Sequence, residues 1–364
     1  QASLIQYRPG IDGLRAVAVV PVILFHAGFN LFSGGFIGVD MFFVISGYLI
    51  TAIILSEIKA GSFSLAKFYE RRARRILPAL FFVIVLCLPF AWFWMTPQQV
   101  KMFLQSVFAT AVFASNFFFA YTSGYFDAAA EEKPLLHTWS LGVEEQFYLI
   151  FPLFFSFFYK FGSRRLGWIV LCLAVLSFGL SEVVSRFGSS VNNFFLTPTR
   201  AWELLLGSLI VLASREGSID RKISILVNDL ASCAGLTLIL LSVITYDKTT
   251  PFPSFYTLAP TIGTVLILVF GTKQTLVAKL LSSRCMVMVG LISYSAYLWH
   301  QPLFAFIRIY SINTPSELLF VFASVVTMAL AYLTWRFIEQ PFRDKRFISQ
   351  RIIFVSAVVG TFAI

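Results

Sequence analysis

Histidine and carboxylate residues lie inside long apolar stretches of this sequence. His26 and Asp40 fall on either side of a short connection, and Glu144 and Glu145 interrupt a later apolar stretch. A carboxylate beside an imidazole fixes its tautomer and raises its basicity, as a general base requires. Consecutive helical residues point about 100° apart, so only one of the two glutamates can face a given side. We therefore predict that His26, held by Asp40 or Glu144, acts as a general base.

Arg15 precedes His26 by eleven residues in the first apolar stretch, which we expect to be helical over 13–33 with His26 seven residues from its outer end. Eleven helical residues return to nearly the same face, about 16 Å along the axis. One stripe would then carry a cation near the cytoplasm and an imidazole near the outside, which suits a molecule that enters from inside. The structural alternatives are a packed histidine for His26 and, for Asp40, a helix-start acid favoured by the dipole.

A cluster of four arginines precedes the third apolar stretch: Arg71, Arg72, Arg74 and Arg75. Guanidinium groups are good ligands for phosphates, because they donate hydrogen bonds in a fixed fork. Basic clusters also anchor the cytoplasmic ends of membrane spans. The two roles are compatible, and we predict that this cluster, with Arg15, binds a phosphate-bearing co-substrate.

Other polar side chains in apolar stretches are candidates for binding substrate or for stabilising an oxyanion. They are Trp139, Tyr148, Arg200, Glu203, Tyr297 and His300. Helix packing is the alternative role for each. The four cysteines have no CxxC spacing, and no metal-binding motif is present, so neither a disulfide framework nor a metal site is predicted.

The elements that position these residues must be membrane helices. The chain has 364 residues, 58% of them hydrophobic and only 13% charged, whereas soluble domains carry roughly 25% charged residues. So much apolar surface cannot be buried in one soluble core of this size. Disordered, fibrous and nucleic-acid-binding classes are excluded, and the net charge of +10 is typical of basic cytoplasmic loops. We predict an all-α, polytopic helical membrane protein.

Positive charge sets the predicted topology. If the polar stretch 98–120 is interfacial or re-entrant, 22 of the 28 Lys and Arg residues fall on the N-terminal side; if it crosses, the two sides are nearly equal. The positive-inside rule favours the first arrangement, with ten complete spans in a domain over 1–346, a cytoplasmic N-terminus and an eleventh span starting within 347–364. The ten spans are expected near 13–33, 36–56, 76–96, 138–159, 166–185, 199–214, 228–246, 257–271, 285–307 and 317–335.

Several motifs in a specific order now give a family resemblance. They are Tyr7-Arg8-Pro9-Gly10-Ile11-Asp12-Gly13-Leu14-Arg15-Ala16, His26, the stretch Gly35 to Thr51, Arg71 to Pro78, His137-Thr138-Trp139-Ser140-Leu141-Gly142-Val143-Glu144-Glu145-Gln146-Phe147-Tyr148, Ser293 to His300, and Glu339-Gln340-Pro341-Phe342-Arg343. Together they resemble the acyltransferase-3 membrane family, in particular its bacterial O-antigen and surface-polysaccharide O-acetyltransferases.

The resemblance implies transfer of an acyl group, usually acetyl from cytoplasmic acetyl-CoA, to a carbohydrate hydroxyl outside the membrane, with a bacterial inner-membrane location. It implies that Arg15 and His26 are essential and that the arginines at 71–75 serve the donor. Many relatives carry an extra span and a periplasmic SGNH-type domain, which the apolar run after Arg351 would fit. Direct transfer and a route through an acyl-histidine both remain open.

The rival hypothesis is a proton-coupled transporter. Intramembrane histidines and carboxylates also form proton relays. Transporters often show internal repeats with paired broken helices, and the sequence has no clear internal repeat. We therefore favour the acyltransferase.

Overall fold

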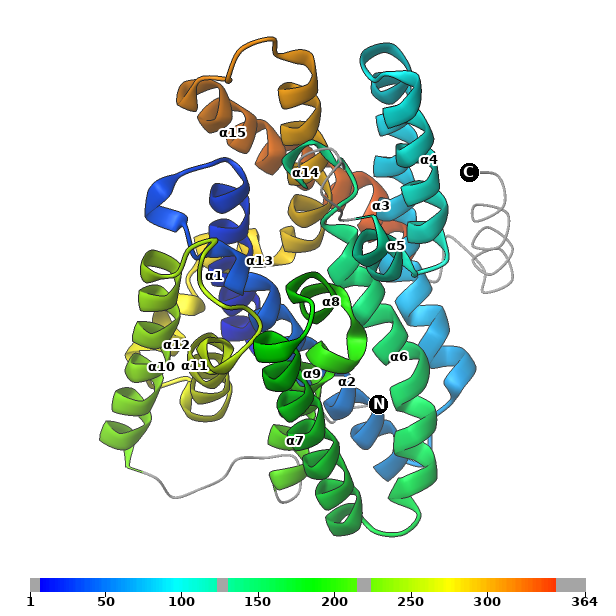
Figure 1. The fold of residues 1–364 in the computed structure, drawn as a ribbon. Coiled ribbons are helices and arrows are strands. Elements are labelled where there is room, and N and C mark those ends of the chain that lie inside the picture. The colour runs from blue at the N-terminus through cyan, green and yellow to red at the C-terminus, as the bar shows by residue number, and fades with distance from the viewer. Residues whose placement is uncertain (1–6, 123–129, 215–223, 345–364) are drawn as a thin grey trace. The chain divides into compact units, whose positions relative to one another are not determined.

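A computed structural model of the protein describes residues 7–122, 130–214 and 224–344, and the regular elements in these ranges are all helices (Figure 1). The chain forms two compact units. Of the described residues, the first comprises 7–25, 30–63, 143–214 and 224–291, and the second comprises 26–29, 64–122, 130–142 and 292–344. The predicted all-α class is confirmed.

The first unit contains most of the helices, including α6, which starts in the second unit. Their bounds are α1 (Pro9–His26), η1 (Asn30–Phe32), η2 (Gly35–Ile37), α2 (Gly38–Lys59), α6 (Thr138–Tyr159), α7 (Ser163–Phe187), α8 (Ser190–Phe195), α9 (Thr197–Ala213), α10 (Ile225–Thr245), η5 (Phe255–Thr257), α11 (Leu258–Phe270), α12 (Leu276–Leu281) and α13 (Arg284–Leu291). Helix α9 packs against both α2 and α7, and α10 packs against α11.

The second unit is built around α14, which packs against α3 and α15. Its elements are α3 (Leu65–Trp94), α4 (Pro97–Ala111), α5 (Ser115–Tyr121), η3 (Ala130–Glu132), α14 (Ser293–Tyr310), α15 (Glu317–Thr334), the π-turn η6 (Trp335–Glu339) and α16 (Gln340–Arg343). Side-chain hydrogen bonds fix α14 on both sides. Tyr294 donates to the Ile76 carbonyl at 2.9 Å, and the Trp299 indole donates to Thr334 Oγ1 at 2.8 Å.

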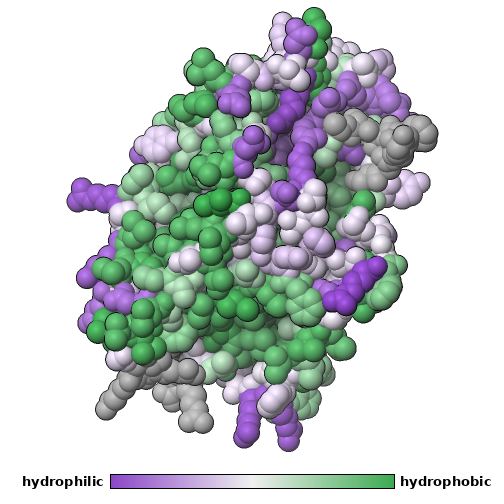
Figure 2. All heavy atoms as spheres, turned by 60° about the vertical axis from the view of Figure 1, so that its left-hand side comes forward, coloured by the Kyte–Doolittle hydropathy of each residue, from purple (hydrophilic) through white to green (hydrophobic). Residues whose placement is uncertain are grey.

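Eight helical segments of the described chain are long and apolar enough to cross a membrane. They comprise α1, η2 with α2, α3, α6, α7, α8 with α9, α10, and α15 with its continuation to Arg343. Large apolar side chains remain exposed on their outer faces, among them Trp168, Leu176 and Phe187 on α7. Apolar residues also cover much of the surface seen in Figure 2. Such faces suit lipid contact, as expected of a polytopic membrane protein.

Two helices differ from the predicted boundaries in ways that matter for the site. Helix α1 ends at His26, so the expectation that the helix runs seven residues further is wrong. Gly28 adopts a left-handed φ of 89° just beyond it, a conformation that terminates a helix. Helix α3 begins at Leu65, capped by Ser64, whose side chain accepts a hydrogen bond from the Lys67 amide. The arginine cluster therefore lies within this helix instead of preceding it.

Two predicted segments are each divided in the structure. The segment 285–307 is broken at Ile292 into α13 and α14. The segment 98–120 forms α4 and α5, and α4 begins with a capping box in which Thr96 and Gln99 exchange hydrogen bonds. Neither α4 nor α5 is among the described helices long enough to span a membrane. The interfacial or re-entrant placement of the segment 98–120 stays a prediction. The extra span expected within 347–364 lies outside the described residues.

Two close backbone approaches define the first unit. A Cβ built on Gly47 of α2 would lie 1.8 Å from the Leu204 carbonyl oxygen, and one on Gly207 of α9 would lie 2.0 Å from the Val44 carbonyl oxygen. Small residues let membrane helices approach this closely. The start of α1 likewise meets α12 and α13: a Cβ on Gly13 would lie 1.9 Å from Leu281 O, and one on Gly290 would lie 1.8 Å from Asp12 O.

We expect Gly47→Ala to destabilise the protein by about 1–3 kcal/mol, because the added methyl overlaps backbone that cannot move without separating α2 from α9. The melting temperature of the purified protein in detergent measures the effect. Gly167→Ala is the matched control, since a Cβ at Gly167 of α7 has no neighbour within 4 Å. Equal melting temperatures for the two variants would contradict the packing argument.

Candidate functional site

The chain has three histidines, and all of them meet in the second unit. The ring centroids of His26 and His300 are 5.0 Å apart, and those of His137 and His300 are 5.3 Å apart. His300 is fully buried and His137 is 3% exposed, while His26 is half-buried at the end of α1. We call His26, His137 and His300 the histidine cluster.

Tyr297 contacts both His137 and His300. Its hydroxyl donates to the His137 carbonyl at 2.9 Å and shares a hydrogen bond of 2.7 Å with the Ser140 hydroxyl. Its own carbonyl lies 2.6 Å from Nδ1 of His300, one turn later on α14. The aromatic rings of Tyr297 and His300 are 5.2 Å apart. Tyr297 and His300, both predicted as candidate binding residues, therefore form one side of the cluster.

Arg308 fixes the main chain at His26. Its Nη2 donates to the His26 carbonyl at 2.6 Å, and its guanidinium lies 4.7 Å above the Phe320 ring of α15. Gln301, the residue after His300, donates to the Lys133 carbonyl at 3.1 Å. Residues from α14 thus bind both the end of α1 and the segment before α6, so three distant parts of the sequence are held together.

His137 precedes α6 and lies outside the predicted membrane spans. Burial, together with the nearby His26, lowers the pKa of His137 to about 3. At neutral pH its ring is therefore uncharged, with one N–H donor and one lone pair. Neither ring nitrogen of His137 has a hydrogen-bond partner within the described part of the chain. A neutral, buried and unpaired imidazole can donate to or accept from a bound substrate.

The described residues provide no group of three or more His, Cys, Asp or Glu side chains that could hold a metal ion. An imidazole side chain with an ordinary pKa can accept, hold and return a proton near neutral pH.

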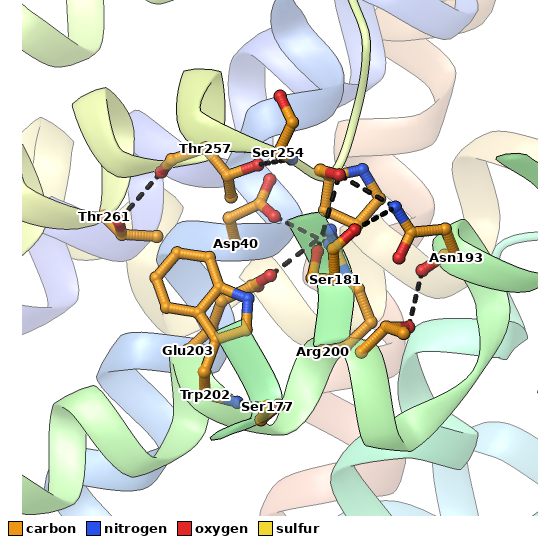
Figure 3. A network of polar contacts seen from close by, with 12 residues as sticks. Asp40, Ser177, Ser181, Asn193, Arg200, Trp202, Glu203, Ser254, Thr257 and Thr261 are labelled. Carbon is orange, nitrogen blue, oxygen red and sulfur yellow. Dashed lines mark hydrogen bonds and ion pairs between the residues drawn. The ribbon is translucent and has the colours of Figure 1, made fainter. Parts of the chain in front are cut away.

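Asp40, Arg200 and Glu203 form a buried charged network in the first unit (Figure 3). Arg200 Nη2 lies 2.7 Å from Asp40 Oδ1, and its Nη1 lies 3.2 Å from Glu203 Oε1. Arg200 is 1% exposed, and both carboxylates are fully buried. Helix α2 supplies Asp40 and α9 supplies the other two, so the glycine contact between these helices is what brings the charges together.

Aromatic rings surround the guanidinium of Arg200. It lies 5.5 Å from the ring centroid of Phe43, 5.7 Å from that of Phe194 and 5.6 Å from that of Phe252. Such rings attract a cation through their quadrupole. Arg200 and Glu203 were predicted to bind substrate, and the structure gives them partners within the protein.

The two consecutive glutamates of α6 have different surroundings. Glu144 accepts hydrogen bonds from Ser46 Oγ at 3.0 Å and from the Tyr148 hydroxyl at 2.9 Å, all in the first unit. Glu145 is half-buried on the same helix. His26 belongs to the second unit, whereas Asp40 and Glu144 belong to the first. The predicted role of either carboxylate in orienting His26 therefore stays a prediction. Trp139 is buried at the start of α6.

The predicted donor-binding arginines also differ from one another. Arg15 lies 3.6 Å from Asp12 on α1. Arg74 is buried and pairs with Glu70 at 2.9 Å, and it also donates to the Phe342 carbonyl at 3.3 Å. Arg71, Arg72 and Arg75 are half-buried on the same helix. Arg74 therefore has a structural role. Arg71, Arg72 and Arg75 are better placed than Arg74 to meet a ligand.

His137, Ser140 and Arg308 were missed as site residues by sequence reasoning. His137 was noticed only as part of a motif, because it lies at the edge of an apolar stretch. The sequence did hold one signal. The chain has only three histidines, and two of them, His26 and His300, were already candidates, so the third could have been considered with them. Arg308 gave no such signal, since a lone arginine after a span is usual.

Together, the fold and the cluster define a polytopic membrane protein in which three imidazoles from distant parts of the sequence lie close together. The chain matches the acyltransferase 3 family, described as an acyltransferase domain, over residues 8–336. It therefore belongs to this acyltransferase family, as the motifs predicted.

Named relatives cover nearly the whole chain. The O-acetyltransferase OatA of Staphylococcus aureus is 33% identical over 370 residues, which is 98% of this chain and 60% of that protein. The peptidoglycan O-acetyltransferase OatA of Listeria monocytogenes is 33% identical over 355 residues, 94% of this chain and 57% of that protein. The chain thus spans about three fifths of the length of these relatives. No solved structure matched the chain.

We expect Arg200→Met to destabilise the protein by about 3–5 kcal/mol, because it leaves two buried carboxylates without their cation. Glu203→Gln should cost only about 0.5–1.5 kcal/mol, since one carboxylate still pairs with Arg200. Melting temperatures of both variants in detergent test the order. A larger loss for Glu203→Gln would show that the pairing with Asp40 does not dominate this network.

Proposed function

We propose that this protein is a membrane O-acetyltransferase that moves an acetyl group from cytoplasmic acetyl-CoA to a hydroxyl of an extracytoplasmic carbohydrate. Family membership supports acyl transfer, and the names of the relatives support acetyl as the group. The observation that carries the proposal is the buried histidine cluster. The His26 imidazole of this cluster can take a proton from a hydroxyl, which is the step that an acyl transfer to a sugar requires.

The chemistry assigns His26 as the base. His26 removes the hydroxyl proton as the oxygen attacks the thioester carbonyl; the new C–O bond forms, the C–S bond breaks, and the imidazolium returns the proton to the leaving thiolate. In the two-step alternative, His26 attacks first and the acetyl-imidazole is then transferred to the hydroxyl. A half-reaction without acceptor separates the routes, because only the second leaves acetyl on His26.

The acyl donor would meet the protein at α3. Arg71, Arg72 and Arg75 are half-buried and carry the charge and donor geometry that the phosphates of acetyl-CoA need. Arg15 on α1 is the fourth cation assigned to the donor. Acetyl-CoA is a co-substrate here, and the proposal involves no metal.

The acceptor is a surface carbohydrate. O-antigen is the acceptor that the sequence motifs favour, and peptidoglycan is the acceptor in the name of the Listeria relative. Both glycans present sugar hydroxyls outside the bacterial cytoplasmic membrane. In this proposal the N-terminus of the chain lies on the opposite, cytoplasmic side. A periplasmic SGNH domain in the same natural chain would receive or complete the transfer. Mass spectrometry of both glycans, with and without the gene, identifies the acceptor.

We expect His26→Ala to lower acetyl transfer by at least about 10²–10⁴-fold, the usual contribution of a positioned base. The measurement is transfer of labelled acetyl from acetyl-CoA to glycan in membrane vesicles. Cys172→Ser is the control, because Cys172 is exposed on α7, far along the chain from the cluster. Wild-type transfer by a folded, inserted His26→Ala protein would remove His26 from the mechanism.

The arginines of α3 should separate into two groups. We expect Arg72→Ala and Arg75→Ala each to weaken acetyl-CoA binding by about tenfold or more, the value of one charge-assisted hydrogen bond. Arg74→Ala should instead lower the melting temperature, because it leaves Glu70 buried without its partner. Binding by titration calorimetry and melting in detergent distinguish them. Unchanged affinity in both Arg72→Ala and Arg75→Ala would place the donor elsewhere.

A further inference from the structure

The protonation pattern of His300 follows from its contact with Tyr297. A carbonyl oxygen only accepts hydrogen bonds, so the 2.6 Å contact between His300 Nδ1 and Tyr297 O requires the hydrogen on Nδ1. In a neutral imidazole the other nitrogen, Nε2, then carries a lone pair and no hydrogen. Nε2 is buried and accepts no hydrogen bond from any residue that the structure describes. His300 is therefore a fixed, unused acceptor.

The ring nearest to this acceptor with a proposed chemical role is His26, at 5.0 Å between centroids. We propose that His300 is a positioning residue for His26: the two rings are in contact but not hydrogen-bonded in this structure, and a rotation of the His26 ring during the reaction would bring its N–H to His300 Nε2. The inference rests on the proposed function, because it gives His26 the orienting partner that a general base requires. It replaces a charged carboxylate in that role with a neutral imidazole.

The charged and titratable groups around His26 make such an acceptor useful. Arg308 places a positive charge against the His26 carbonyl, which disfavours a second cation on the neighbouring imidazole. Glu131 and Glu132 interact with Arg308 and so offset part of its charge. His137 faces His300 from the segment before α6. Within the cluster itself, the lone pair of His300 Nε2 is available to a protonated His26.

During transfer, His300 would keep its own hydrogen throughout. His26 accepts the hydroxyl proton on one nitrogen while its other N–H donates to His300 Nε2. The oxygen forms its bond to the acetyl carbon, the thiolate leaves, and the proton on His26 passes to the thiolate. Tyr297 contributes by holding His300 Nδ1, and thus prevents His300 from presenting an N–H toward His26.

Two amide substitutions separate positioning from packing. His300→Asn can still donate to the Tyr297 carbonyl, but its side chain is too short to reach His26. His300→Gln places an amide group near the position of Nε2 and can supply the acceptor. Both are polar and neutral, so loss of packing should affect them alike. Tyr310→Phe is the control on the same helix, because Tyr310 is 69% exposed.

The readout is kcat/KM for acetyl transfer from acetyl-CoA, measured against pH. We expect His300→Asn to lose about 10- to 100-fold, with the midpoint of the acid limb moved to lower pH, because a protonated His26 loses its acceptor. His300→Gln should recover most of the rate and the wild-type midpoint. Equal losses in both variants with an unmoved midpoint would overturn the proposal.

A measurement on the wild-type protein decides the matter even where a variant does not fold. Nitrogen-15 NMR of the histidine-labelled protein reports which ring nitrogen carries hydrogen. We expect His300 as the Nδ1–H tautomer at neutral pH, and an Nε2–H tautomer would refute the inference. Failure of the proposed function would give a different result, because the wild-type protein would then transfer no acetyl group from acetyl-CoA.

Discussion

A charge inside an apolar helical protein has to be balanced by other groups of the protein, because lipid supplies neither hydrogen bonds nor counter-ions. The first unit satisfies this constraint with Asp40, Glu203 and Arg200, all essentially inaccessible. The charge-assisted hydrogen bond between Arg200 and Asp40, 2.7 Å long, forms only if α2 and α9 lie close together. Gly47 and Gly207 make that approach possible. Helix packing and charge burial are thus two aspects of one arrangement.

The second unit also pairs buried charges, Arg74 with Glu70 on α3, but its histidine cluster meets the same constraint with neutral groups. His137 and His300 are buried as imidazoles, and backbone carbonyls bind Tyr297, Gln301 and His300. A neutral imidazole costs far less to bury than a carboxylate and still offers a lone pair and a donor. Proton transfer needs groups whose charge can change during the reaction. The proposed chemistry therefore belongs with the histidine cluster, and the fixed ion network of the first unit supports the fold.

Hydropathy predicted the all-α class and the position of most long helices, because apolar length is a local property of the sequence. It misjudged the end of α1 and the start of α3, which depend on Gly28 and Ser64, single residues within otherwise continuous patterns. It also predicted a role for His26, His300 and Arg200. It could not find His137 beside His300, or Arg200 beside Asp40, since 163 and 160 residues separate those pairs. Only tertiary packing reveals such neighbours.

Gly13 of α1 packs directly against the backbone of α12, and Gly290 of α13 packs against the backbone of α1. This close packing has a consequence for biogenesis. Helix α1 leaves the ribosome well before α12 and α13, because the segments that it fits against are made more than 250 residues later. At ordinary rates of translation this delay is on the order of tens of seconds. Throughout it, the face of α1 around Gly13 must be occupied by lipid or by an insertion factor. This face of α1 is thus locked late, and a chain truncated before α12 would leave the face uncovered, even though the rest of α1 still packs against η2 and α2.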